Sequence, residues 1–331
     1  MNIQKPGLTL YGLFTLMAFL AAAPLLLGAT VSSILVLLLV YAALAYSINF
    51  ITGMIGYVDF GHVLFMAIGS YTLAAMVSYY GANPLLGVGA GAVLGLAFAL
   101  GIGLVILRFR GVYFAIATVV LVLAAYNIVL QLPQLGVGGE IILNQTIQPF
   151  APYFTIWTIV LIEIVLTYYI NRSRIGFGIR AIKNEEDAAS AVGVSPQRLK
   201  LIGYMLGGLF GGASGGVYAW STSVVTAGPA FDFTISLLIL AMIIIGGMGT
   251  SIGPLLGAVV VYIPSYFLLT TVVQAQPLLI GLLVIIMALF LPDGIVGLLR
   301  KSSHRLRLML ELAWPSFKRS ASQRISEECK L

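Results

Sequence analysis

The chain has 331 residues, of which 60% are hydrophobic and 8% are charged, and its mean hydropathy is +1.06. An ordinary soluble domain has about a quarter of its residues charged, so this composition excludes a soluble globular domain and indicates a polytopic membrane protein. The net charge of +6 reflects membrane topology rather than nucleic-acid binding, because the cations gather between and after the apolar segments. The single cysteine, Cys329, excludes a disulfide framework, and with only two histidines, His62 and His304, we expect no metal site and no cofactor.

The N-terminal segment is apolar from Leu8 to Gly28. At about 20 residues it is long enough to cross a bilayer by itself, and we interpret it as the first membrane span. Lys5, the apolar run and the small residues Ala21–Ala23 also fit a cleavable signal peptide, so that alternative stays open.

About ten apolar segments of spanning length follow one another along the chain. The eighth is short, and the ends of all of them are approximate. These segments predict an all-α fold, a polytopic integral membrane protein in which nearly every helix crosses the bilayer. The expected spans are 8–28, 30–51, 61–80, 85–107, 112–132, 153–170, 201–223, 233–247, 254–271 and 277–299.

The positions of the cations predict a topology for these spans. Lys5 precedes the first span, two groups lie at 108–110 and 172–200, and the rest follow the last span from Arg300. If the chain crosses about ten times from a cytoplasmic N-terminus, every Lys and Arg falls on the cytoplasmic side, as the positive-inside rule requires. Both termini are then cytoplasmic.

The charge distribution divides the chain into two parts. Residues 1–300 form the membrane domain, with one long cytoplasmic loop at 172–200, and residues 301–331 form a basic tail. The tail either lies along the anionic inner leaflet or is a solvated, disordered segment. The sequence leaves both readings open.

Glycines recur four residues apart in two of the expected spans. Small residues at this spacing let helix backbones approach closely in lipid. We therefore predict tight helix packing, with a glycine-lined pore as the alternative. The glycines are Gly87, Gly91 and Gly95 in one span and Gly207, Gly208, Gly211, Gly212, Gly215 and Gly216 in another.

A hydrophilic island interrupts the apolar sequence at 184–193. Asn184 is a suitable N-cap, the acids at 185–187 suit the positive end of a helix, and Gly193 can end that helix in the left-handed conformation. The Ser-Pro pair at 195–196 then starts the next helix. A helix of about two turns is too short to be stable alone, so it either connects two spans as a solvated helix or docks, through its alanine face, on a soluble partner.

The island resembles the coupling loop of permease subunits of bacterial ATP-binding cassette importers, which has Glu-Ala-Ala followed by Gly. In that family the loop forms a short helix that binds the ATPase. Here Asp187 stands at the acidic position and Glu186 one place earlier, and either of them could make the main contact. The resemblance implies that the ATPase-coupling residues are Glu185, Glu186, Asp187, Ala188, Ala189 and Gly193.

Further blocks of sequence resemble the branched-chain amino acid permeases of the LivM type. They follow the order of that family over about residues 45–300, and their order and spacing are more specific than any single block. The blocks are 53–62, 65–71, 108–118, 173–176, 181–185, 246–254 and 291–294.

This resemblance implies a permease subunit, not an enzyme, that moves branched-chain or other hydrophobic amino acids across the plasma membrane by alternating access. The implied partners are two ATP-binding subunits, a second, LivH-like permease subunit, an extracellular or periplasmic solute-binding protein and membrane lipid. Urea and short-chain amide permeases are similar, so the substrate stays open. A stand-alone ion-coupled transporter or channel is the alternative of another class, and it predicts several intramembrane charges, whereas Glu163 is the one acid well inside an expected span.

Two places are candidates for the translocation path. The segment 53–62 is broken by glycines at a membrane boundary, and irregular backbone at that depth is tolerated only where it is buried in protein or lines a cavity. Gly56, Asp59 and His62 are therefore candidates, with the satisfaction of backbone groups as the alternative. Glu163 either forms an interhelical hydrogen bond or lies near the path.

The glycine-rich stretch 246–254 lacks the Gly-Lys-Ser/Thr ending of a phosphate-binding loop. Without that lysine it has no cation for the phosphates. We interpret it as a sharp turn between two spans, so ATP hydrolysis has to come from another polypeptide.

Overall fold

The computed structural model describes residues 24, 28, 31–131, 140–143, 150–271, 281–282 and 294–298. Nearly all of the first and tenth expected spans lies outside the described residues, and so does the whole basic tail. Cys329 and His304 lie in that tail. The fold is therefore described from the second expected span to the ninth.

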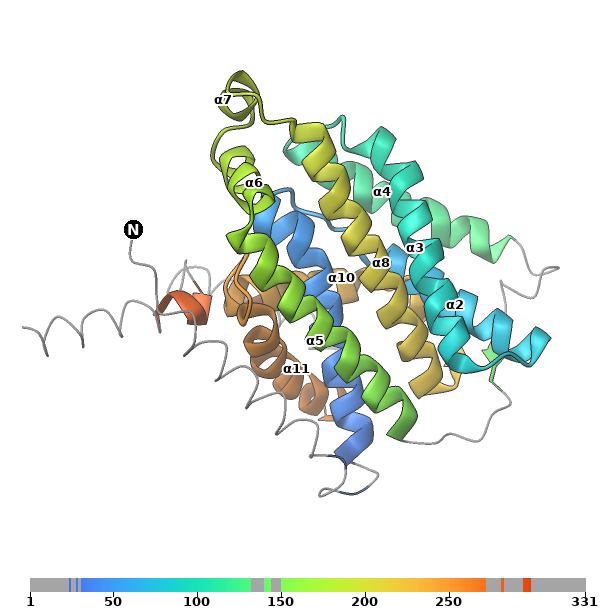
Figure 1. The fold of residues 1–331 in the computed structure, drawn as a ribbon. Coiled ribbons are helices and arrows are strands. Elements are labelled where there is room, and N and C mark those ends of the chain that lie inside the picture. Colours follow the sequence, from blue (N-terminus) through green and yellow to red (C-terminus); the bar gives the residue numbers. More distant parts are fainter. Residues whose placement is uncertain are drawn as a thin grey trace, which may run out of the picture.

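The described chain is a bundle of helices (Figure 1). The first helix of the bundle runs from Val31 to Ile55. The C-terminal part of this helix is a π-helix, η1 (Asn49–Ile55). The second to ninth expected spans each coincide with a helix, with ends shifted by a few residues. The further elements are α2 (Val63–Tyr80), α3 (Pro84–Ile106), α4 (Val112–Leu130), β1 (Ile141–Ile142), α5 (Phe150–Arg172), α6 (Arg174–Asn184), α7 (Glu186–Ala191), α8 (Pro196–Thr222), β2 (Val224–Val225), α9 (Ala227–Ala230), α10 (Phe233–Gly246) and α11 (Gly253–Thr271).

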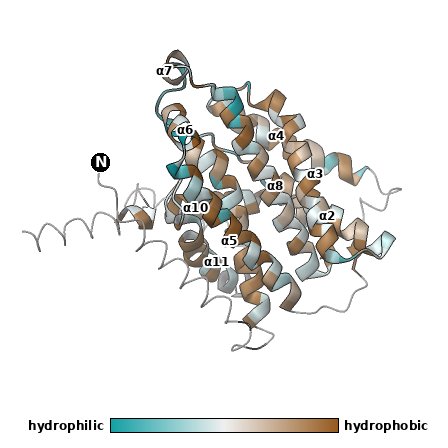
Figure 2. Cartoon of the chain, viewed as in Figure 1, coloured by the Kyte–Doolittle hydropathy of each residue, from teal (hydrophilic) through white to brown (hydrophobic). Residues whose placement is uncertain are grey.

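Six helical segments of the described chain are long and apolar enough to cross a membrane. Figure 2 shows hydrophobic residues along the bundle and a more hydrophilic stretch at α6 and α7. The polytopic, helical membrane fold is thus confirmed, while the count of ten spans and the cytoplasmic termini stay predictions. The six segments are Val31–Ile55, Val63–Tyr80, Pro84–Ile106, Val112–Leu130, Phe150–Arg172 and Ala227–Gly246.

Helices α2, α3 and α8 pack backbone against backbone. A Cβ added to Gly95 of α3 would lie 2.2 Å from the carbonyl oxygen of Gly208 in α8, and one added to Gly212 would lie 2.3 Å from that of Gly91. Gly69 of α2 meets α8 at a similarly short distance. These glycines face neighbouring helix backbones and not a pore, because only a residue without Cβ permits this approach.

Loops that the predicted topology puts on one side of the membrane lie at one end of the bundle. Arg110, between α3 and α4, pairs with Asp187 of α7 at 2.9 Å, and Asn171 of α5 donates to the Gly249 carbonyl, between α10 and α11, at 2.9 Å. At the other end of α8, β2 pairs antiparallel with β1. This short ribbon joins the segment between α4 and α5 to the segment that follows α8, and nothing in an all-α reading of the sequence predicted it.

The glycine contacts predict the effect of a single methyl group. Gly95→Ala should destabilise the bundle by about 2 kcal/mol or more, because the added Cβ overlaps the Gly208 carbonyl. In the matched control Gly101→Ala, on the same helix, the new Cβ meets nothing within 4 Å, so the better helix propensity of alanine should leave stability equal or higher. Thermal unfolding of the two purified variants in detergent tests this, and equal melting temperatures would contradict the packing argument.

Candidate functional site

The loop at 172–200 folds as two short helices that lead into α8. Ser173 caps α6 by accepting a hydrogen bond from the Gly176 amide at 3.3 Å, and the apolar face of α6 is buried through Ile182. This buried face carries α6 on to Asn184, so the expectation that Asn184 is the N-cap of the island helix was wrong.

The N-cap of α7 is instead Glu185, which has an extended backbone (φ −159°, ψ 110°). Glu186 and Asp187 occupy the first turn, where the helix dipole favours acids. Gly193 has φ +86°, and Pro196 follows the N-cap Ser195 as the first residue of α8. The predicted stop and restart of the helix are therefore confirmed.

Helix α7 has one face toward the protein and one toward solvent. Ala189 is buried, whereas Ala188 is exposed. The Asp187 side chain is 72% exposed, and Val192 is 78% exposed. Of the two alanines expected to contact a partner, only Ala188 is therefore accessible. The sequence analysis missed the exposed Val192, which could have been noticed as an apolar residue next to Gly193.

Glu186 points inward and joins α7 to two other elements. Its Oε1 accepts a hydrogen bond from Lys200 of α8 at 2.8 Å, and its Oε2 accepts one from the Tyr57 hydroxyl. Lys200 is buried, and its Nζ also donates to the Tyr57 hydroxyl at 3.1 Å. Glu186 therefore holds α7 to its own chain, while Asp187, paired with Arg110, remains at the surface.

The protonation states follow from these contacts. Burial by itself raises the pKa of Glu186, but the hydrogen bonds from Lys200 and Tyr57 and the charge of Arg110 outweigh it, so the pKa of Glu186 lies below its ordinary value. Burial and the bond to Glu186 raise the pKa of Tyr57. At neutral pH Tyr57 is thus the donor and Glu186 the ionised acceptor.

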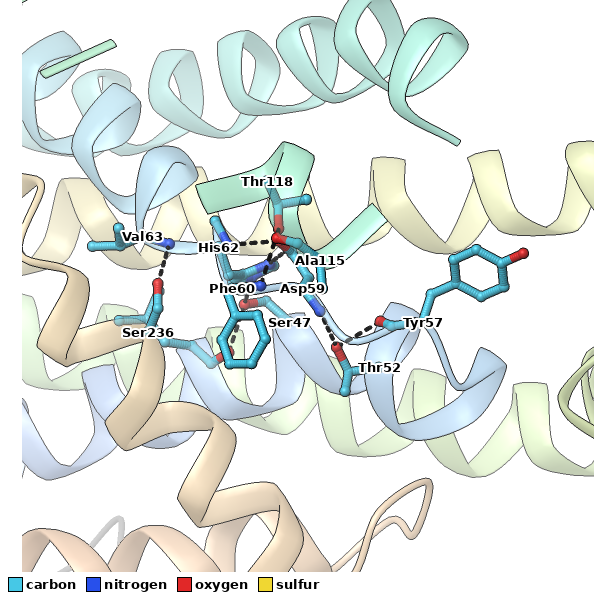
Figure 3. Close-up of polar contacts among 12 residues, drawn as sticks. Ser47, Thr52, Tyr57, Asp59, Phe60, His62, Val63, Ala115, Thr118 and Ser236 are labelled. Carbon is cyan, nitrogen blue, oxygen red and sulfur yellow. Dashed lines mark hydrogen bonds and ion pairs between the residues drawn. The ribbon is translucent and has the colours of Figure 1, made fainter. Parts of the chain in front are cut away.

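A second polar cluster lies in the segment between η1 and α2 (Figure 3). His62 Nδ1 lies 3.1 Å from Asp59 Oδ2, and both side chains are fully buried. His62 Nε2 is hydrogen-bonded to Ser47 Oγ at 2.7 Å, and Asp59 Oδ1 accepts from the Gly61 amide at 2.8 Å. Two of the four residues expected near the path, Asp59 and His62, are thus in contact, and His62 also contacts Ser47, which the sequence analysis did not single out.

The same segment has its backbone donors bonded by side chains of other helices. Gly56 ends η1 with φ +92°, and the chain stays non-helical until α2. Thr118 Oγ1 of α4 accepts from the Phe60 amide at 3.2 Å, and Ser236 Oγ of α10 accepts from the Val63 amide at 3.2 Å. Serine and threonine inside apolar spans were the sequence signal for these contacts.

Glu163 makes no hydrogen bond to this cluster. It is fully buried on α5, and neither carboxylate oxygen has a hydrogen-bond partner in the described part of the chain. The interhelical hydrogen bond considered for Glu163 is therefore not formed within the described part of the chain. Among the described residues, no cluster of three or more His, Cys, Asp or Glu side chains could hold a metal ion.

The depressed pKa of Glu186 predicts how α7 responds to pH. A carboxyl with a depressed pKa stabilises the fold above its unfolded value, about 4.3, and that contribution disappears as the pH falls through the folded pKa. Amide hydrogen exchange of residues 186–193, corrected for intrinsic rates, should be slow at pH 7 and faster in acid. Glu186→Gln should exchange faster at pH 7 and lose the pH step, whereas the exposed control Asp187→Asn should retain it; an unchanged profile in Glu186→Gln would contradict this account.

The sequence of the chain is similar to those of known transport proteins. The chain is 26% identical to the high-affinity branched-chain amino acid transport system permease proteins LivM of Salmonella typhimurium (strain LT2) and Escherichia coli (strain K12), with 87% of this chain and 75% of each relative aligned. It is 25% identical to the probable branched-chain amino acid transport permease protein LivH of Methanocaldococcus jannaschii, over 81% of this chain and 91% of the relative. No solved structure shows significant similarity to it.

The match extends beyond single relatives. The family described as "Branched-chain amino acid transport system / permease component" matches residues 30–291, which include the bundle, both polar clusters and α7. A multi-pass protein of the plasma membrane agrees with the six apolar helices of spanning length. The chain therefore belongs to the branched-chain amino acid transport permease family.

Proposed function

We propose that this chain is the membrane permease subunit of an ATP-binding cassette importer, and that its substrates are branched-chain or related hydrophobic amino acids. The family match over residues 30–291 carries this proposal. The substrate class is taken from the LivM relatives, which are branched-chain amino acid transport permeases and are 26% identical over 87% of this chain. The chain conducts the substrate and leaves ATP hydrolysis to other subunits.

Two ATP-binding subunits energise the importer, and one of them contacts α7 of this chain. Support comes from the outward face of α7, where Asp187, Ala188 and Val192 are accessible. Glu186, in contrast, anchors the helix from the inside, so Asp187 is the acid that faces the partner.

A second permease subunit and a solute-binding protein complete the importer. Both LivM-type and LivH-type permeases are among the relatives, which supports a pair of similar subunits. The binding protein delivers the amino acid at the end of the bundle where β1 and β2 pair. Closure of the ATPases then moves the permease between outward-open and inward-open states, as alternating access requires.

The coupling role of α7 is tested by separating transport from hydrolysis. Reversing the acids in Glu186→Lys with Asp187→Lys, or replacing Gly193 by Val where φ is +86°, should leave membrane insertion intact but remove substrate-dependent uptake while ATP hydrolysis continues. The assembled importer in proteoliposomes, assayed for both activities, gives the answer. Normal uptake in these variants would exclude α7 as the coupling helix.

The energy source separates an importer from an ion-coupled transporter. Uptake of radiolabelled leucine into vesicles should require ATP and the ATPase subunits, and should persist when the ion gradients are collapsed. Unlabelled isoleucine and valine should compete, and urea or acetamide should not. Uptake that follows an ion gradient without ATP would overturn the proposed function, and competition by urea or acetamide would change the substrate.

A further inference from the structure

Tyr57 lies at the point where the first helix ends and the buried cluster begins. Gly56 turns the chain with a left-handed backbone, and the Tyr57 carbonyl accepts a hydrogen bond from Thr52 Oγ1 at 3.0 Å. The same Thr52 hydroxyl accepts from the amide of Asp59 at 3.1 Å. The backbone of Tyr57 is thus tied to the segment that carries Asp59 and His62.

The side chain of Tyr57 belongs to the α7 network. Its hydroxyl donates to Glu186 and accepts from Lys200, and Lys200 Nζ also lies 4.6 Å from the centre of the ring. Hydrogen bonds with charged partners are the stronger ones in proteins. The Tyr57 hydroxyl therefore joins the base of α7 to the start of α8. The Tyr57 backbone is bonded to Thr52 of η1.

On its other side, Tyr57 starts a line of aromatic rings that reaches the buried histidine. Its ring centre lies 5.4 Å from that of Phe114, which lies 6.3 Å from that of Tyr204. Tyr204 is 5.3 Å from Phe65, and Phe65 is 5.4 Å from His62. All four contacts are edge-to-face, and close-packed interiors of this kind change between discrete arrangements and do not deform continuously.

A second contact fixes the segment just before Tyr57 to α6. Lys183 Nζ donates to the Gly53 carbonyl at 2.7 Å, near the C-terminus of η1, where a cation is favoured. Burial lowers the pKa of Lys183, and its bond to the carbonyl keeps the ammonium hydrogen-bonded. Residues 53–57 are therefore attached to the α6–α7 unit at both ends.

We propose that Tyr57 is the positioning residue through which α7 moves the non-helical segment 56–62. The inference rests on the proposed function of α7 as the coupling helix. When an ATPase displaces α7, Glu186 and Lys200 carry the Tyr57 hydroxyl with them, and the aromatic line passes the shift toward His62. The backbone of this segment is bonded to single side chains of α4 and α10 and not to a helical ladder, so its conformation follows the positions of those side chains.

The test removes one hydroxyl group. Tyr57→Phe keeps the ring contacts, and it should lower amino acid uptake per ATP hydrolysed about tenfold, the effect of losing a hydrogen bond to a charged group. Tyr113→Phe is the matched control, because Tyr113 is 74% exposed on α4. Glu186→Gln and the double variant with Tyr57→Phe complete a mutant cycle, measured on the whole importer in proteoliposomes after melting curves confirm that each variant is folded.

A double variant no worse than the more impaired single variant supports a shared route through Tyr57 and Glu186. Independent, multiplicative losses, or uptake in Tyr57→Phe equal to that in Tyr113→Phe, would overturn the inference. Coupled uptake in the Glu186→Lys, Asp187→Lys variant would remove the coupling role of α7, whereas uncoupling in that variant together with normal uptake in Tyr57→Phe would remove only the role of Tyr57.

Discussion

The non-helical segment between η1 and α2 depends on having its backbone donors bonded inside an apolar bundle. An unsatisfied amide in such surroundings costs on the order of several kcal/mol. Thr118 from α4, Ser236 from α10 and Asp59 from the segment itself accept these hydrogen bonds. The break in the helix therefore exists only as long as α4 and α10 keep their places beside the segment.

Glycine packing holds these elements in place. Helix α8 comes within backbone contact of α2 and α3 because Gly91, Gly95, Gly208 and Gly212 have no side chain. The same helix passes the buried cluster, where a Cβ on Gly207 would lie 3.1 Å from His62 Cε1. The small residues thus serve both to pack the bundle and to leave room for the His62 ring.

Helix α8 also links the cluster to the surface helix. Its first turns carry the buried Lys200, which meets Glu186 and Tyr57, and its middle packs beside His62. Because one continuous helix contacts both places, the loop at 172–200 and the non-helical segment are neighbours in the structure. Tyr57 and Glu186 are 129 residues apart in the sequence, and no local propensity specifies such a contact. The two faces of α7 have different surroundings, since Glu186 is bonded to the protein interior and Asp187 lies at the surface.

Residue patterns along the chain were sufficient to predict the class of protein and the positions of its helices. Hydropathy located the helices of the second to ninth expected spans. It can do so because a segment that crosses the bilayer has to form all its backbone hydrogen bonds within one long apolar helix. Glycine spacing identified the packing faces of α3 and α8, and Gly193 and Pro196 identified the end of α7 and the start of α8. The resemblance to the branched-chain amino acid permeases added the family, which the matches over residues 30–291 confirm.

Which polar residues meet follows from the tertiary fold and not from residue patterns along the chain. Capping rules placed the helix start at Asn184, but the buried apolar face of α6 moved it to Glu185. Hydrophobic patterns treat Glu186 and Asp187 alike, and the fold turns one toward Lys200 and the other toward solvent. Such pairings join residues far apart in the chain, and their energies depend on burial and on the three-dimensional arrangement of partners, which local sequence does not encode.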